Sequence, residues 1–167
     1  YFYFLRLYEK YIEPVSSTFA WALMPNHFHF LVKINDENLE KIPHQYFSNL
    51  FNAYTKAINK RFKRYGPLFV ENFERREITN PVYFKNLIHY IHYNPVHHRF
   101  AERMTDYPWT SYQTIVSIKE SKTLTAYLNE NIKEGFILDG IQRLNTLQRT
   151  YKKSTNELNL ERVLFLN

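Results

Sequence analysis

The chain has 167 residues, of which 44% are hydrophobic and 18% aromatic, and this length and composition suit one domain with a sizeable core. Lysine and arginine number 22 against 16 aspartate and glutamate residues, giving a net charge of +6 that favours an acidic partner such as nucleic acid. The absence of cysteine excludes disulfides and thiolate metal sites, and no apolar run reaches the roughly 18 residues of a membrane span, so we expect a cytoplasmic protein without a membrane partner.

The first part of the chain predicts a helix followed by a β-hairpin. Apolar residues recur at helical spacing from Phe2 until Pro14 ends the helix. The sequences SSTFAWALM and HFHFLVKI, residues 16–24 and 27–34, are typical of two strands that pair across a tight Pro-Asn turn. The helix begins without a cap, so we expect an N-terminal element before Tyr1, outside this numbering.

The middle of the chain predicts a second helix and a further strand. Residues 43–65 carry a stripe of apolar residues at helical spacing. Residues 68–78 are typical of an extended stretch that ends in a strand. We expect one domain over residues 1–118, followed by a helical C-terminal extension of unknown role over residues 119–167, because that part is polar and helix-prone.

A third helix is expected after the extended stretch. Asn80 is a good N-cap, and Pro81 suits the first turn of a helix because its missing N–H would be unpaired there in any case. The helix should end at Asn94, since Pro95 follows.

Two histidines stand one residue apart in the apolar run MPNHFHFLV, residues 24–32. Side chains alternate between the two faces of a strand, so His27 and His29 point the same way. Two imidazoles on one face suit adjacent ligands of a divalent ion such as Mn²⁺, Fe²⁺ or Zn²⁺, with the other positions left for substrate or water. The alternative is a surface strand whose solvent-facing side carries histidines with no such role.

The third helix carries residues that could complete such a site. Tyr90 and Asn94 are four residues apart and therefore share a helix face. An amide oxygen is a hard ligand that makes Mg²⁺ or Mn²⁺ more credible, and a phenol one turn away could attack a metal-bound phosphate. Tyr83 and Tyr93 are competing nucleophiles. The alternative is that Tyr90 packs at the edge of the core and Asn94 only ends the helix.

Four stretches taken in order resemble the HUH single-tyrosine transposases, and especially the REP-associated tyrosine transposases. They are MPNHFHFLV, GPLFVENFERREI, YIHYNPV and DYPWTSY, and together they span about Ser17 to Tyr112. The combination is far more specific than the histidine pair alone. One departure is the sequence NPVHHRF, where members of the family commonly have a small residue or glycine soon after NPV.

The resemblance implies an α+β fold, in which a ferredoxin-like antiparallel sheet carries helices on one face and its first strand precedes Tyr1. It implies that His27, His29 and Asn94 bind a divalent metal, Mg²⁺ or Mn²⁺, and that Tyr90 is the nucleophile. The implied activity is cleavage and rejoining of single-stranded DNA near hairpins, through a 5′-phosphotyrosine intermediate, as in DNA transposition. The family includes monomers and dimers that share sites, so the resemblance leaves a homodimer open.

Several basic residues are candidates for contacts with the DNA backbone, which supplies most of the affinity in such complexes. They are Lys56, Lys60, Arg61, Lys63 and Arg64 on the second helix, and His97, His98 and Arg99 after the third. Both sets could equally be solvated surface. His92 points away from Tyr90 on the helix, and we expect it to be partly buried and hydrogen-bonded. Trp109 could stack on bases but is better explained as core.

Two other functions remain open from the sequence. A nucleic-acid-binding protein on the same fold would bind DNA without cutting it. A hydrolase with a two-histidine metal site would cut without a covalent intermediate, and its Tyr90 would be structural.

Overall fold

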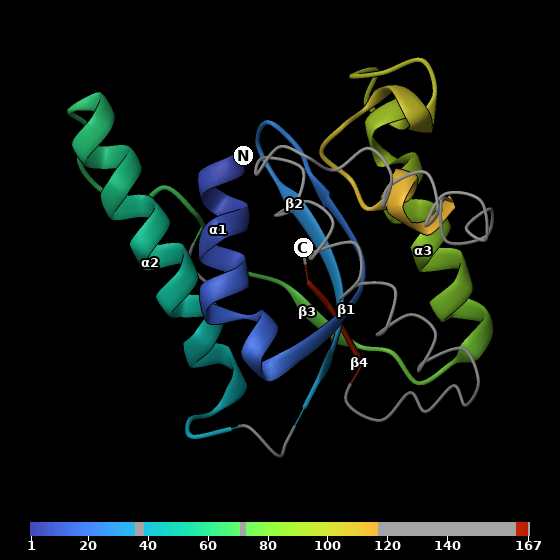
Figure 1. Cartoon of the computed structure of the whole chain (residues 1–167), viewed down its shortest axis with the longest axis horizontal. Coiled ribbons are helices and arrows are strands. Elements are labelled where there is room, and N and C mark those ends of the chain that lie inside the picture. The colour runs from blue at the N-terminus through green and yellow to red at the C-terminus, as the bar shows by residue number, and fades with distance from the viewer. Residues whose placement is uncertain (36–38, 71–72, 117–162, 167) are drawn as a thin grey trace, which may run out of the picture.

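In the computed structural model, residues 1–35, 39–70, 73–116 and 163–166 are described. They form a four-stranded antiparallel sheet with helices packed against it (Figure 1). The helices are α1 (Phe2–Tyr11), α2 (Pro43–Phe62) and α3 (Pro81–His97). The strands are β1 (Ser16–Leu23), β2 (Phe28–Ile34), β3 (Arg75–Glu77) and β4 (Val163–Leu166), and they lie side by side in the order β1-β2-β4-β3.

The sheet has helices on both faces. On one face α1 and α2 cover a cluster that includes Phe30 and Val32 of β2. On the other face α3 covers a second cluster that includes Leu31. The alternation of side chains along a strand assigns neighbouring residues to opposite faces and so divides the core in two. Figure 1 shows α1 and α2 on one side of the strands and α3 on the other. The expectation of helices on a single face is therefore correct for α1 and α2 and wrong for α3.

The hairpin and the first two helices lie where the sequence predicts them. The strands β1 and β2 pair in antiparallel fashion, with Ala22 opposite His29. Three residues of the predicted extended stretch form the short strand β3. No helix in the described parts of the chain is both long and apolar enough to cross a membrane.

Strand β4 is the main difference from the expected architecture. The helical prediction for residues 119–167 is wrong at Val163–Leu166, which form a strand between β2 and β3; residues 117–162 and 167 lie outside the described part. With β4 placed first and the chain then followed from α1, the elements run β-α-β-β-α-β, which is the ferredoxin-like arrangement. Strand β4 is thus a central strand of the sheet although it follows all the other described elements in the chain.

Helix α3 begins as predicted and ends later than predicted. The side chain of Asn80 accepts hydrogen bonds from the backbone N–H groups of Val82 and Tyr83, at 2.9 and 3.0 Å. The helix runs through Pro95 to His97, because a proline in the last turn forfeits only one backbone hydrogen bond and is itself fully buried here. The prediction that Pro95 ends the helix is therefore wrong.

Candidate metal and nucleophile site

The two histidines meet the predicted face of α3. His29 lies on β2 and His27 immediately precedes that strand. The centroids of the His27 and His29 rings are 5.0 Å apart, and the centroid of the Tyr90 ring is 5.4 Å from that of His29. The Nε2 atom of His27 is 3.4 Å from Oδ1 of Asn94. The structure thus brings together the four residues that the sequence singles out, from two elements far apart in the chain.

The site is built on rigid elements on both sides. Strand β2 lies inside the sheet, between β1 and β4. Helix α3 is fixed to the sheet by buried apolar residues, among them Leu87 and Ile91. Tyr90 and Asn94 are one helical turn apart, so the helix itself sets the spacing of the phenol and the amide. The packing of α3 on the sheet then sets the position of both groups relative to the histidines.

A buried hydrogen-bond network ties α3 to β1. The Nε2 atom of His92 is 2.8 Å from Oγ of Ser111, and this oxygen accepts a hydrogen bond from the N–H of Trp21 at 2.9 Å. The hydroxyl proton of Ser111 can then be donated to the neutral imidazole. The prediction that His92 is hydrogen-bonded is confirmed, with a partner from the sequence DYPWTSY, and its ring is buried more completely than the partial burial expected. The network positions the helix between Tyr90 and Asn94.

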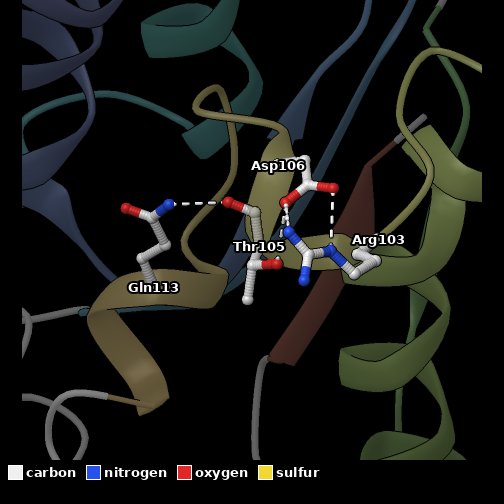
Figure 2. Close-up of polar contacts among 4 residues, drawn as sticks. All are labelled: Arg103, Thr105, Asp106 and Gln113. Atoms are coloured by element: carbon white, nitrogen blue, oxygen red, sulfur yellow. Dashed lines mark hydrogen bonds and ion pairs between the residues drawn. The ribbon is translucent and has the colours of Figure 1, made fainter.

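The segment that carries Ser111 is held in place by polar contacts of its own (Figure 2). Arg103 donates two hydrogen bonds to the carboxylate of Asp106, at 3.0 and 2.9 Å. The side-chain amide of Gln113 donates to the carbonyl oxygen of Thr105 at 2.8 Å. These contacts are local to residues 103–113, and Ser111 within this stretch makes the link to β1 through Trp21. Trp109 packs against the core, as expected, and stacks on Tyr1 at 4.7 Å.

Burial leaves polar atoms of the site without partners. His29 is only 2% exposed and Asn94 only 1%. Both ring nitrogens of His29 and the side-chain nitrogen of Asn94 are buried without a hydrogen-bond partner. Such atoms cost about 1–3 kcal/mol each when they stay unpaired, and native proteins have few of them. Three in one cluster leave donors and acceptors that a bound ligand would satisfy.

The geometry at His27 favours a cation as that ligand. The Nδ1–H of His27 donates to Oδ1 of Asn26 at 2.8 Å, which leaves the lone pair of Nε2 directed away. That atom faces the Asn94 oxygen at 3.4 Å. Two acceptors cannot form a hydrogen bond with each other, and 3.4 Å is long for one. The spacing does suit two neighbouring ligands that are each about 2.0–2.2 Å from one ion.

The histidines are in the protonation state that a metal ion requires. Burial lowers the pKa of His29 to about 4, with a further contribution from the charge of His27 that the Asn94 amide partly offsets. Burial also lowers the pKa of His27. Both rings are therefore neutral at pH 7, with lone pairs available for coordination.

Two imidazoles and one amide oxygen fit a divalent ion whose remaining positions are open to water or a phosphate oxygen. Within the described residues, no group of three or more histidine, aspartate or glutamate side chains is placed to hold a metal. A metal ion at this site would therefore need the Asn94 amide as its third protein ligand. The His98 ring is 5.2 Å from the His27 ring and belongs to the rim of the site.

Tyr90 differs from the two competing tyrosines in its surroundings. It is 46% exposed, so its hydroxyl can reach a substrate, and its ring lies against His29. Tyr93 is similarly exposed but stacks on His89, at 5.7 Å. Tyr83 accepts a long hydrogen bond of 3.5 Å from Arg76 on the edge strand β3. Of these three phenols, Tyr90 is the one beside the histidine pair.

The candidate DNA-contacting residues fall into two places. Those of α2 and its end lie on the far side of the sheet from α3, so the structure does not bring them to the histidines. Lys56, Lys60, Arg61 and Lys63 are exposed, whereas Arg64 is half-buried and donates to Asn59 at 3.1 Å. His97, His98 and Arg99 follow the site directly and are exposed.

Two residues near the site were not predicted from the sequence. Asn26 orients the His27 ring, and its position next to that histidine was the available signal. Phe165 of β4 stacks on His29 at 5.7 Å and meets the Tyr90 ring edge-on at 6.4 Å. Nothing in the local sequence indicates that residue 165 reaches a site formed by residues 27–98.

The buried histidines predict a loss of stability in mild acid. The pKa values of His29 and His92 are lowered to about 4, mainly by burial, whereas the unfolded chain has ordinary values near 6.5. Between these values the unfolded state binds more protons. The free energy of unfolding should therefore be highest above pH 6.5 and fall toward pH 4, by about 2–4 kcal/mol per histidine. Urea unfolding with EDTA at pH 7.5, 5.5 and 4.5 measures this, and an unchanged midpoint would contradict the burial of both rings.

No family model, no curated protein and no solved structure matches the chain.

Proposed function

We propose that the protein is a metal-dependent single-stranded DNA endonuclease and strand transferase that acts through a 5′-phosphotyrosine intermediate. The convergence of His27, His29 and Asn94 beside an exposed Tyr90 is the observation that carries the proposal. The sequence motifs that resemble the HUH single-tyrosine transposases and the net charge of +6 support it. By the resemblance to these transposases, the substrate would be single-stranded or hairpin DNA, and the process would be DNA transposition or a related rearrangement.

The residues divide the work as follows. His27, His29 and Asn94 would hold Mg²⁺ or Mn²⁺, which polarises a phosphate oxygen and orients the scissile phosphate. The Tyr90 oxygen forms a bond to phosphorus as the bond from phosphorus to the 3′ oxygen breaks. The phenol loses its proton to solvent, and the departing 3′ oxygen takes one up. Rejoining is the same exchange in reverse, so the cycle needs no external energy source.

Covalent capture tests the proposal. The full chain is incubated with 5′- or 3′-labelled single-stranded DNA that contains a hairpin, with Mn²⁺ or with EDTA, and then separated under denaturing conditions. We expect a band of labelled protein that resists denaturant, appears only with the metal and carries the DNA through a 5′ phosphate. Cleavage without this band would indicate a hydrolase, and binding without cleavage would indicate a binding protein on the same fold.

A further inference from the structure

A cavity of about 580 Å³ lies next to the site, on the other side of His27. It is formed by α1, α2, the turn between β1 and β2 and residues 68–70. Its volume is in the range of small-molecule sites, which are about 300–1,000 Å³. Nothing in the proposed chemistry at Tyr90 uses this space.

The walls of the cavity are aromatic. They include Phe4, Phe28, Phe51, Tyr54 and Phe69. The rings brace one another: Phe28 stacks on Phe51 at 5.2 Å, and Phe69 lies 4.8 Å from Phe51 and 6.1 Å from Tyr54. A rigid cluster of rings is the kind of surface on which nucleobases stack, and such stacking tolerates any base because every base has a π-face.

The cavity and the site share a wall. Asn26 and His27 line the cavity, and the same His27 ring points its Nε2 atom at Asn94 in the site. His27 therefore belongs both to the lining of the cavity and to the histidine site. A strand that runs past His27 would bring a base to the cavity while its phosphate stays at the site.

A cation on the cavity side of α2 favours an occupant that carries phosphate. Helix α2 contributes Tyr54 and Ile58 to the cavity, and the exposed Arg61, three residues after Ile58, lies on the same face of the helix. An apolar ligand would make no use of this cation, whereas a phosphate next to a buried base would pair with it. Burial raises the pKa of Tyr54, so its hydroxyl remains a hydrogen-bond donor at neutral pH.

We propose that this cavity binds one unpaired nucleobase of single-stranded DNA, next to the phosphate held by the histidine site. The inference rests on the proposed function and adds a binding subsite to it. It requires the base to leave any stack or pair, so the site selects an unpaired strand at the cut.

The first experiment uses the wild-type chain in EDTA, so that no cleavage occurs. A 12-nucleotide strand of 5-iodo-deoxyuridine is bound and irradiated, and crosslinked peptides are identified by mass spectrometry. We expect crosslinks at Tyr54 or Phe69, because both rings line the cavity. Crosslinks only at exposed tyrosines such as Tyr90, Tyr93 and Tyr65 would overturn the inference. This arm does not depend on the folding of any variant.

The second experiment measures the Kd of 12-nucleotide oligothymidylate and of an abasic strand of equal length. Tyr54→Ala should weaken binding of oligothymidylate about tenfold and leave binding of the abasic strand unchanged, while Tyr54→Phe should bind as the wild type does. Tyr46→Ala is the matched control, since Tyr46 is a half-buried tyrosine two turns earlier on α2. The Tyr46 hydroxyl accepts a hydrogen bond from the backbone N–H of Glu40, in the loop before the helix. If Tyr54→Ala weakened binding of both strands equally, the base-binding role of the cavity would be overturned and the proposed function would stand. If the wild type bound neither strand, the proposed function would be overturned.

Discussion

Tyr90→Phe is expected to yield no covalent protein–DNA adduct and to slow cleavage by several orders of magnitude. The substitution removes a single oxygen. The ring contacts with His29 and Phe165, at 5.4 and 6.4 Å, do not involve that oxygen and should persist. DNA binding should therefore stay within about twofold of wild type, because backbone and stacking contacts do not need the phenol. Gel analysis of the adduct and a binding titration with the same hairpin strand measure the two effects separately.

The neighbouring tyrosines supply the controls for this result. Tyr93→Phe changes a phenol of nearly equal exposure on the same helix, and Tyr83→Phe changes one at its beginning. Both variants should form the adduct at the wild-type rate. An adduct that survives Tyr90→Phe but disappears in Tyr93→Phe would identify Tyr93 as the nucleophile. It would contradict the assignment of Tyr90 from its position beside the histidines.

His29→Leu should separate function from stability. Without metal the variant should be more stable than wild type by about 1–3 kcal/mol, because a leucine leaves no unpartnered nitrogen in a residue that is 2% exposed. The same change removes a ligand, so the adduct should be lost. Manganese at 100 times its Kd should stabilise the wild type by about 2.7 kcal/mol and the variant by far less.

Urea unfolding with Mn²⁺ or with EDTA measures the stability of His29→Leu without metal and its stabilisation by metal. His44→Ala is a suitable control, since His44 is an exposed histidine in the first turn of α2, on the far face of the sheet. It should change neither stability nor the response to metal. A wild-type chain that gains no stability from Mn²⁺ or Mg²⁺ would contradict the assignment of His27, His29 and Asn94 as ligands.

Local patterns account for most of the fold. The helical spacing in α1 and α2, the alternation in β1 and β2 and the Asn80–Pro81 start of α3 are all visible in the sequence because each depends on neighbouring residues. Strand β4 is different. A four-residue strand has too little length for a periodic signal, and its place is decided by its pairing with β2 and β3.

The site shows the same division. The pair His27 and His29 follows from strand alternation, and Tyr90 and Asn94 follow from the helical turn, so each half is local. That the halves meet at 3.4 Å depends on how α3 packs across the sheet, which the resemblance implied and the spacing alone did not. The run of α3 past Pro95 could not be predicted, because a buried proline is tolerated only through its tertiary contacts.

The separation of α2 and α3 by the sheet restricts the shape of any nucleic acid that touches both. Such a molecule has to change direction around an edge of the sheet. A double helix resists bending over lengths shorter than about 50 nm, whereas a lone strand can follow the curve at small cost. The protein would then discriminate through the stiffness of the polymer, before any base or phosphate is recognised.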